Sequence, residues 1–515
     1  MNLRRSTVLL GTVTALLLPP TGALALPDAT GPALPDAVGY EAENGTLSQA
    51  VVESNHAGYT GTGFVNYDNV AGGYVEFSVP ASTAGPATLT FRYANGTTGD
   101  RPLAVAVNGT ATATAFPATG AWTTWKTVTV TAALAAGPNI VRATATTAAG
   151  GPNLDSVTVG GQAGTDWSVA VTDSTMKRKT PDTLGGWGYT EGLYLYGQYL
   201  VYQRTHDPRL LAYMRAWADR FVAADGSIAF SFNNLDQMQS GNVLLLLAKE
   251  TGQAKYQKAA KKIRDRLRTY PTTGDGGLIH ATSKTGQLWA DGSFMVVPFI
   301  IRYGHQFGEA QWGDDLAAQQ LLVYAAHLQQ SNGLLLHAYD ETKSQSWADK
   351  QTGLSSQYWC RAIGWYGMAA IDTLELLPAN HPKRAAIIDS VRRLVAGYAR
   401  YQDPATGRWF QVVDRGELAG NWTETSCSAM YAFTVDRAVQ RGYVDASYQP
   451  VADRGYRGVL GKVARNSDGL SDVADISVGT NVGDLNYYLG RTRATNDLHG
   501  LGAFLIMNEQ LGPVG

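Results

Sequence analysis

The sequence predicts a multidomain chain, with an N-terminal antiparallel β-sandwich (jelly roll) followed by an all-α toroid of six helical hairpins. Short runs of alternating apolar and polar residues, bounded by Gly, Asn and Pro, fill residues 38–161. From residue 166 onward the apolar period becomes that of helices. In this second part, loops rich in aromatic and polar residues repeatedly lead into helices that are apolar nearly all round, as buried helices are.

Length and composition bound the class of protein. A chain of 515 residues is too long for one ordinary core, which also favours several domains. The net charge is -2 with 16% charged residues, so neither nucleic acid nor an anionic membrane is an expected partner. The 12 Trp and 26 Tyr offer flat faces on which sugar rings stack, although the same residues also fill cores.

The N-terminus has the three parts of a secretory signal peptide. Two early arginines precede an apolar run over residues 8–18, and an Ala-Leu-Ala sequence ends at Ala25. We therefore expect residues 1–25 to be cleaved, residues 26–37 to form a linker, and the mature protein to be secreted. No later stretch is long and apolar enough to predict a membrane helix.

The strands of the first domain are expected where alternation is clearest. These runs are GGYVEFSVP, ATLTFRYANG, PLAVAVNG, TTWKTVTVTAAL, PNIVRATATT and LDSVTVGG. So many short strands in one domain-sized segment favour an antiparallel sandwich over residues 38–161. Residues 162–165 are expected to form a second linker.

The second domain, residues 166–515, is expected to hold about twelve helices. Their expected ranges are 166–179, 188–205, 208–222, 236–251, 254–270, 292–307, 314–329, 358–377, 383–401, 426–441, 447–463 and 499–510. Helices such as KYQKAAKKIRDRL and HPKRAAIIDSVRRL carry a charged face and are expected outside a ring of six apolar helices. In an α/α toroid the inner helices begin at one end, so the loops before them converge on one cavity.

The functional prediction centres on Asp291, within residues 276–299. Its neighbours are aromatic and apolar, and His280 lies one loop away. Such surroundings disfavour a negative charge, so we expect a raised pKa for Asp291 and a carboxyl that can act as a general acid. The alternative is that Asp291 caps the helix expected to begin at Gly292. The two roles are compatible.

Other polar and aromatic residues are expected at the same mouth of the toroid. They are Asp236, Trp359, Arg361, Trp365, Glu424, His499 and Tyr189, with His280 and His337 in nearby loops. Each could instead cap a helix or pack the ring. Arg361 lies between two tryptophans and needs an anionic partner, either a substrate carboxylate or a salt bridge to Asp236 or Asp340.

Other chemistries find less support. His280 and His337 have no close Cys or His at metal-ligand spacing, and no phosphate-binding loop or nucleophile-elbow motif is present. The two cysteines, Cys360 and Cys427, could form a disulfide in an exported protein, and two buried free thiols fit the sequence equally well.

Six sequences in the second domain carry a family resemblance. In order they are GGLIH, LWADGSFM, GLLLHAYDE, TGLSSQYWCRAIGWYGMAAID, ETSCSAMYAF and NDLHGLGAFL. Together, over residues 166–512, they resemble the unsaturated rhamnogalacturonyl hydrolases of glycoside hydrolase family 105. The resemblance implies an enzyme that removes Δ4,5-unsaturated galacturonic acid from the nonreducing end of lyase-generated rhamnogalacturonan and pectin oligosaccharides, without a catalytic cofactor.

The resemblance also implies roles for individual residues. Asp291 would be the general acid/base and Asp236 its supporting carboxylate. The subsite for the unsaturated sugar would be lined by His280, Trp289, Met295, His337, Trp359, Arg361, Trp365 and Tyr189. One departure is Ala281 directly after His280, where the family pattern has Lys or Asp. The related unsaturated glucuronyl hydrolases share fold and mechanism, so the preferred uronate stays open.

The implied chemistry explains how one carboxyl can be enough. An ordinary glycosidase needs an acid and a second carboxylate. Protonation of C4 in the unsaturated sugar produces a cation at C5, which water captures, and the hemiketal then opens and releases the aglycone. One group that gives a proton and then takes one from water serves both steps. The alternatives are a non-catalytic protein that binds plant polysaccharide, and a toroid that acts as an ordinary inverting glycosidase or a lyase.

The first domain resembles a family 35 carbohydrate-binding module in YEAENGTL, GYTGTGFVNYDN, YANGTTGDRPLAVAVNG, WTTWKTV and GPNLDSVTV. Glu41 and Glu43 fall on one face of an expected strand, since alternate side chains point the same way. With Asp155, the resemblance implies a Ca²⁺ site; the alternative is a surface acidic pair.

The expected ligand of this module is a uronate in plant cell-wall polysaccharide. The residues expected to grip it are Arg101, Trp122 and Asn153. Arg101 is a candidate because it has no evident structural role in its loop. Trp122 could equally be a core residue, and Trp125 is expected to be one.

Overall fold

The computed structural model describes residues 38–81, 85–135, 137–160 and 166–512, and the chain divides into two units, Met1–Gln162 and Ala163–Gly515. Each unit has its own hydrophobic core. The expected signal peptide over residues 1–25 and the expected linkers over 26–37 and 162–165 lie outside the described residues.

The front unit consists of two antiparallel sheets. One has the order β3 (Ala50–Glu53), β4 (Phe64–Tyr67), β11 (Asn153–Gly160), β6 (Gly85–Ala94) and β9 (Lys126–Leu134), with β1 (Val38–Glu41) also on β11. The other has the order β2 (Thr46–Ser48), β5 (Tyr74–Ala81), β10 (Gly137–Ala145), β7 (Leu103–Val107) and β8 (Thr110–Thr114). Alternate residues of these strands are buried, among them Phe91, Val141 and Val157. The predicted β-sandwich is confirmed.

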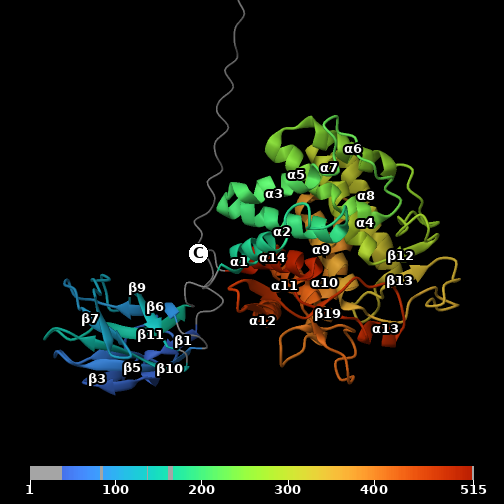
Figure 1. Cartoon of the computed structure of the whole chain (residues 1–515). Helices are drawn as coiled ribbons and strands as arrows, with labels where there is room; N and C mark the ends of the chain where they lie inside the picture. Colours follow the sequence, from blue (N-terminus) through green and yellow to red (C-terminus); the bar gives the residue numbers. More distant parts are fainter. Residues whose placement is uncertain (1–37, 82–84, 136, 161–165, 513–515) are drawn as a thin grey trace, which may run out of the picture. The chain divides into compact units, whose positions relative to one another are not determined.

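The second unit is a ring of helices (Figure 1). Its inner helices are α2 (Tyr189–Thr205), α5 (Gly241–Thr251), α7 (Asp291–Gln306), α9 (Cys360–Leu376), α11 (Thr425–Gln440) and α14 (Leu498–Leu511). Each contacts the next, and α14 packs against α2 to close the ring. The outer helices are α1 (Trp167–Arg178), α3 (Pro208–Ala218), α6 (Ala254–Leu267), α8 (Ala310–Leu328), α10 (Arg384–Tyr401) and α12 (Gln449–Leu460). The predicted α/α toroid is confirmed.

The loops of the toroid contain structure that the helical period does not indicate. It comprises the short helices α4 (Leu235–Gln239), η2 (Ala446–Tyr448) and α13 (Leu485–Leu489), and the paired strands β12 (Gln287–Trp289) with β13 (Ala338–Asp340), β14 (Trp409–Phe410) with β15 (Thr423–Glu424), β16 (Val463–Arg465) with β17 (Ser471–Val473), and β18 (Ile476–Ser477) with β19 (Arg493–Ala494). The helix expected over 236–251 is divided at Ser240, whose hydroxyl donates to the Gly188 carbonyl at 2.6 Å.

Cys360 and Cys427 form a disulfide, which settles the alternative that the sequence left open. It joins the first residue of α9 to the first turn of α11, and its two Cα atoms lie 5.7 Å apart. Among the described residues, no helix combines the length and the apolar character needed to span a membrane.

Candidate active site

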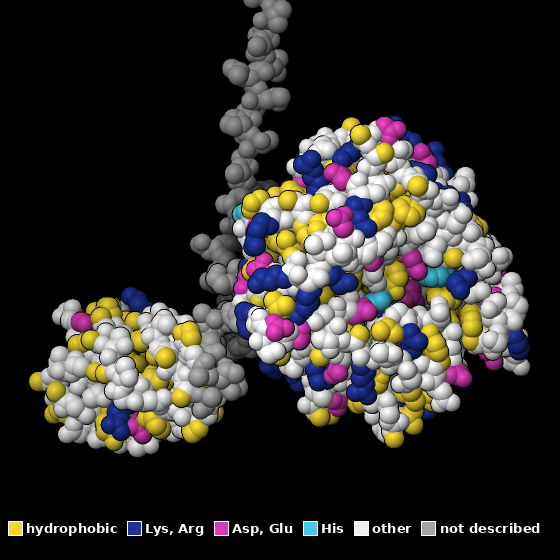
Figure 2. All heavy atoms as spheres, in the orientation of Figure 1, with side chains coloured by type: hydrophobic (Ala, Val, Ile, Leu, Met, Phe, Trp, Pro, Cys, Tyr) yellow, Lys and Arg dark blue, Asp and Glu magenta, His cyan; other side chains and the backbone are white. Residues whose placement is uncertain are grey.

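Asp291 and His337 form the centre of the candidate site. The pairing of β12 with β13 brings their segments together, and the Ala290 N–H donates to the His337 carbonyl at 2.8 Å. The imidazole Nε2 of His337 then lies 3.0 Å from Asp291 Oδ2. Figure 2 shows a hollow in the surface of the helical unit, in which acidic and histidine side chains lie.

Asp291 is not a helix cap. Helix α7 begins at Asp291 itself, and the N-cap position is taken by Ala290, one residue earlier than expected. The carboxylate is directed to His337 instead of to the free N–H groups of the first turn. With 9% exposure, Asp291 is nearly buried, yet it keeps some accessible surface. The capping alternative is therefore wrong for this residue.

The hydrogen bonds of His337 indicate how its proton is placed. The hydroxyl of Tyr488, in α13, lies 2.6 Å from Nδ1 of His337 and accepts a hydrogen bond from the Gly483 N–H at 3.2 Å. The Tyr488 proton is then free to go to Nδ1, which leaves Nε2 to donate to Asp291. His337 is completely buried, so this arrangement is shielded from solvent.

The expected raised pKa of Asp291 is wrong. Burial by itself raises this pKa, but the electrostatic attraction of the His337 and His280 rings and the hydrogen bond from His337 outweigh burial, so the pKa of Asp291 lies below its ordinary value. The pKa of Asp236 is instead raised, first by burial and then by the charge of Asp291. The sequence analysis named both histidines but based the pKa of Asp291 on its apolar neighbours alone, because the sequence does not show that His337 donates a hydrogen bond to this carboxylate.

Asp236 lies beside His280 across from Asp291. It is the second residue of α4, and the Leu235 N–H donates to the His280 carbonyl at 3.0 Å. Nε2 of His280 lies 3.8 Å from Asp236 Oδ2. The His280 ring stacks on Trp289, with centroids 4.4 Å apart and planes 8° apart. The fold thus brings together the two predicted carboxylates and both predicted histidines.

A continuous row of rings extends from His280 through Trp289 and His337 to Trp359. The Trp289 and His337 rings meet edge to face at 5.7 Å, and those of His337 and Trp359 lie 4.7 Å apart. Trp365 stacks on Phe294 and meets the edge of Tyr189. Tyr189 is partly exposed, whereas Trp359, Trp365 and Met295 are almost completely buried. Met295 thus packs into the ring core.

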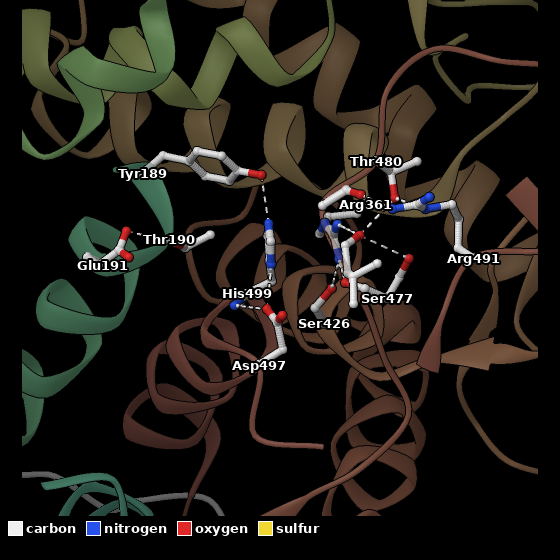
Figure 3. Close-up of polar contacts among 12 residues, drawn as sticks. Tyr189, Thr190, Glu191, Arg361, Ser426, Ser477, Thr480, Arg491, Asp497 and His499 are labelled. Carbon is white, nitrogen blue, oxygen red and sulfur yellow. Dashed lines mark hydrogen bonds and ion pairs between the residues drawn. The ribbon is translucent and has the colours of Figure 1, made fainter. Parts of the chain in front are cut away.

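Arg361 forms no salt bridge among the described residues, so the alternative of a salt bridge to Asp236 or Asp340 is wrong. Its guanidinium lies over Trp359, 4.8 Å from the ring centroid. It donates to the backbone carbonyls of Ser477 and Val478 (Figure 3). Asp340 instead accepts hydrogen bonds within its own turn, for example from Ser344 N–H at 2.7 Å. The arginine is completely buried, and its direct hydrogen-bond partners are backbone carbonyls and the Ser426 hydroxyl, none of which carries a negative charge.

Three buried polar atoms along this row have no hydrogen-bond partner among the described residues. They are Nδ1 of His280, Nε1 of Trp359 and Nε of Arg361. Buried polar atoms in folded proteins are nearly always paired, so such a group of unpaired atoms marks a place where a polar ligand is expected. All three belong to residues that the sequence placed in the sugar subsite.

Two residues of the site were missed by sequence reasoning. Tyr488 comes from a five-residue helix with no clear period. Lys284 lies in the turn after His280, with its Nζ 4.3 Å from the Trp289 ring centroid, and its charge partly offsets the rise that burial causes in the pKa of Asp236. A positive charge therefore lies on this side of the site four residues after His280, although Ala281 occupies the position where the family pattern has Lys or Asp. The sequence could have indicated Lys284, because it follows His280 by only four residues.

The described residues contain one group of His, Cys, Asp or Glu side chains with ligand atoms close enough to share a metal ion, namely Cys360, Glu424 and Cys427. The two sulfurs are joined in the disulfide and so offer no thiolates. Glu424 is completely buried and accepts from the N–H groups of Ser426, Cys427 and Ser477. This group is therefore structural, and Glu424 caps α11.

The three acidic residues predicted as calcium ligands meet at one loop of the front unit. The Thr60 N–H donates to Asp155 at 2.8 Å, the Thr60 hydroxyl lies 2.9 Å from a Glu41 carboxylate oxygen, and the Thr62 N–H donates to Glu43 at 2.7 Å. Glu43 was expected on a strand, but it lies in the 3₁₀ turn η1 (Ala42–Asn44).

The surroundings of Glu41, Glu43 and Asp155 show how well these three carboxylates fit a cation. Asp155 pairs with Arg92, and the carboxylates are not all within 4.8 Å of one another, so a cation would have to draw them together. One oxygen of Glu43 is buried without a partner. Three carboxylates around one arginine leave an excess of negative charge, and this donor set suits a hard cation such as Ca²⁺.

Of the three residues predicted to hold a sugar in the front unit, the fold brings two into contact. The Arg101 guanidinium lies 5.3 Å from the Trp122 ring centroid, and Trp122 is partly exposed. Arg101 also donates to the Gly151 carbonyl at 2.9 Å, so it does have a structural role, contrary to expectation. Asn153 is buried at the start of β11. Trp125, expected in the core, is partly exposed at the surface.

Comparison with known proteins agrees with the geometry of the helical unit. Residues 167–511 match the family model described as Glycosyl Hydrolase Family 88. A solved glycoside hydrolase of family 105 from C. acetobutylicum is 34% identical, with a TM-score of 0.64, and the match covers 67% of this chain and 99% of that one.

The front unit has relatives of its own. Residues 41–161 match the model described as Carbohydrate binding module (family 6). A solved family 35 module from Clostridium thermocellum is 46% identical over 24% of this chain and 96% of that one, with a TM-score of 0.24. The exo-beta-D-glucosaminidase of Amycolatopsis orientalis is 57% identical over 122 residues, which are 23% of this chain and 12% of that protein. The chain thus spans a small part of this relative's length.

The chain belongs to Glycosyl Hydrolase Family 88, and a carbohydrate-binding module precedes its glycoside hydrolase domain.

Proposed function

We propose that the helical unit removes Δ4,5-unsaturated galacturonic acid from the nonreducing end of rhamnogalacturonan and pectin oligosaccharides that a lyase has cut. The observation that carries the proposal is the Asp291–His337 hydrogen bond of 3.0 Å within a wall of aromatic rings. This pair can hold a proton in a site largely shielded from water. The unpaired nitrogen atoms of His280, Trp359 and Arg361 would form hydrogen bonds with the polar groups of the sugar.

The charge of Arg361 favours an acidic sugar. A buried guanidinium without a carboxylate partner is costly, and a uronate carboxylate would supply the missing negative charge. The sugar could accept from Nε of Arg361, which has no partner among the described residues, or replace the Ser477 or Val478 carbonyl as the acceptor of one of its other N–H groups. Lys284 adds a second positive charge on the Trp289 side.

The proposed reaction starts with transfer of a proton from Asp291 to C4 of the alkene. A bound uronate brings a negative charge close to Asp291, which raises its pKa and favours the protonated form. Water then adds to the cation at C5 and returns a proton to the Asp291–His337 pair. The C5 hemiketal opens to a ketone, and C1, now a hemiacetal carbon, releases the aglycone. One water is consumed, and the enzyme regains its starting protonation state.

The proposal is tested by following the ultraviolet absorbance of the alkene with unsaturated rhamnogalacturonan and unsaturated glucuronoside fragments. We expect the absorbance to fall, and to fall faster with the rhamnogalacturonan fragments. A faster fall with the glucuronosides would reassign the protein to unsaturated glucuronyl hydrolysis. A rise in absorbance would indicate a lyase, activity on saturated substrates an ordinary glycosidase, and binding without turnover a non-catalytic protein. Each of these last three outcomes contradicts the proposal.

We further propose that the protein is secreted and that its front module holds it on acidic plant cell-wall polysaccharide. The signal-like residues 1–25 support export, and the Cys360–Cys427 disulfide suits an oxidising compartment. The partly exposed Trp122 with Arg101 across its face offers a stacking surface and a positive charge, which suit a uronate.

We propose that Glu41, Glu43 and Asp155 bind Ca²⁺ in the front module. Because a bound ion stabilises only the folded form, removal of Ca²⁺ by EDTA is expected to lower the melting temperature of the front unit in the full-length protein by about 5 to 10 °C. The measurement is differential scanning calorimetry with and without added Ca²⁺. The variant Glu43→Gln should start at the lower temperature and no longer respond to EDTA. Identical melting of the wild-type protein in Ca²⁺ and in EDTA would contradict the site.

A further inference from the structure

A hydrogen-bonded chain of three residues reaches the candidate site from α14. The Tyr189 hydroxyl lies 2.7 Å from His499 Nε2, and His499 Nδ1 lies 2.5 Å from Asp497 Oδ1 (Figure 3). Tyr189 is the first residue of α2, and Asp497 is the N-cap of α14. The closure of the ring between α2 and α14 therefore brings these side chains together.

The direction of each hydrogen bond follows from Asp497. Its carboxylate also accepts from the His499 backbone N–H at 3.0 Å, and an ionised carboxylate has no proton to donate. His499 Nδ1 must therefore carry a proton and donate it to Asp497. In a neutral imidazole this leaves Nε2 as an acceptor, so the Tyr189 hydroxyl donates to His499.

His499 is kept neutral by its surroundings. Burial and the positive charge of Arg361 lower the pKa of His499 to about 4, although Asp497 acts in the opposite direction. At neutral pH the imidazole therefore accepts and does not donate toward Tyr189. The pKa of Tyr189 is raised by burial, which keeps its hydroxyl protonated.

Tyr189 is close enough to the proposed chemistry to take part in it. Its ring edge lies against Trp365 and it is partly exposed, and after burial the charges of Arg361, Asp236 and Asp291 are among the causes that act on its pKa. Since its only proton is committed to His499, its oxygen can offer nothing but lone pairs to a molecule in the site. A group that binds to the Tyr189 oxygen must therefore be a hydrogen-bond donor.

We infer that Tyr189 presents an obligate hydrogen-bond acceptor to a hydroxyl group of the bound unsaturated sugar, and that His499 and Asp497 are positioning residues that fix this polarity. The inference rests on the proposed function. It makes the site selective for a sugar with a free hydroxyl at this point. His499 acts through Tyr189 and does not itself touch the sugar.

A matched pair of substitutions at His499 tests the inference. In His499→Gln the amide reaches the place of Nε2 and its oxygen can accept from Tyr189, whereas in His499→Asn the shorter amide reaches only Asp497. With an unsaturated rhamnogalacturonan disaccharide we expect His499→Gln to keep the wild-type KM. We expect His499→Asn and Tyr189→Phe each to raise KM about 3- to 10-fold, the value of one neutral hydrogen bond, with kcat little changed.

The double variant Tyr189→Phe/His499→Asn separates positioning from a general structural effect. If His499 acts only through Tyr189, the double variant should have the KM of Tyr189→Phe alone. Multiplied effects, a fall in kcat with unchanged KM, or equal losses in His499→Gln and His499→Asn would each overturn the inference. Melting temperatures identify any variant that fails to fold, and Tyr189→Phe with His499→Gln still decides the case. A wild-type protein that consumes no alkene would instead overturn the proposed function.

Discussion

Asp291→Asn is expected to lose about a thousandfold in kcat on an unsaturated rhamnogalacturonan fragment, the usual range for removal of a general acid. Asparagine keeps the shape of the side chain and can still contact His337, but it has no acidic proton to transfer to C4. The measurement is the rate of loss of alkene absorbance at saturating substrate. The melting temperature should change little, because the substitution leaves α7 and its N-cap unaltered.

Asp314→Asn is a matched control. Asp314 is also a buried aspartate paired with a histidine, with Oδ1 2.8 Å from His305 Nε2, but the pair is formed between α7 and α8 outside the site. We expect this variant to keep wild-type activity. If Asp236→Asn lost more activity than Asp291→Asn, the proton donor would have to be reassigned to Asp236, whose pKa is already raised by burial. An active Asp291→Asn would contradict the mechanism.

The direction of the pH dependence follows from the same pair. The donor must be protonated, so both kcat/KM and kcat should fall as pH rises. The pKa of Asp291 is held low by His337 and His280 before the substrate arrives, and a bound uronate raises it. Because kcat/KM reports the free protein and kcat the complex, the fall in kcat is expected at higher pH than the fall in kcat/KM.

Loss of the Cys360–Cys427 disulfide is expected to cost about 4 kcal/mol of folding free energy, since the bond closes a long loop in the unfolded chain. For a domain of this size that corresponds to a fall of about 5 °C in melting temperature. The measurement is thermal unfolding of the wild-type protein, Cys360→Ala, Cys427→Ala and the double variant.

The three variants should melt at nearly the same temperature, because each removes the same bond. Wild-type protein in a reducing agent should approach that temperature, while the variants should not respond to the reducing agent. Losses that add in the double variant would show that the sulfurs contribute by packing alone. An unchanged melting temperature under reducing conditions would contradict a stabilising role for the bond.

The toroid could be predicted because its signals are local. Apolar residues at helical spacing identify α7 and α9, and charged faces on α6 and α10 place those helices outside. Asp291 could be predicted because it lies directly at the start of α7, which has a clear apolar pattern, and His337 because it lies in the motif GLLLHAYDE. Their contact through the pairing of β12 with β13 could not, since those strands have three residues each.

The electrostatics of the site could not be predicted because they depend on long-range contacts. The pKa of Asp291 is set by His337, 46 positions away, and the orientation of His337 depends on Tyr488, 151 positions further along. Arg361 likewise looked in need of a carboxylate, but the chain supplies the carbonyls of Ser477 and Val478. In each case the sequence shows the residue but not the distant partner that its side chain contacts in the fold.

Closure of the ring between α2 and α14 has a consequence during synthesis. Helix α2 is buried on the face that α14 covers, yet roughly 300 residues separate the two helices, which at common rates of translation means about 15 to 60 s on the ribosome. Until α14 emerges, the apolar flank of α2 has no partner and is open to aggregation or to capture by a chaperone. A nascent chain that stalled before Leu498 would therefore be recognised as misfolded although five of its six inner helices were complete.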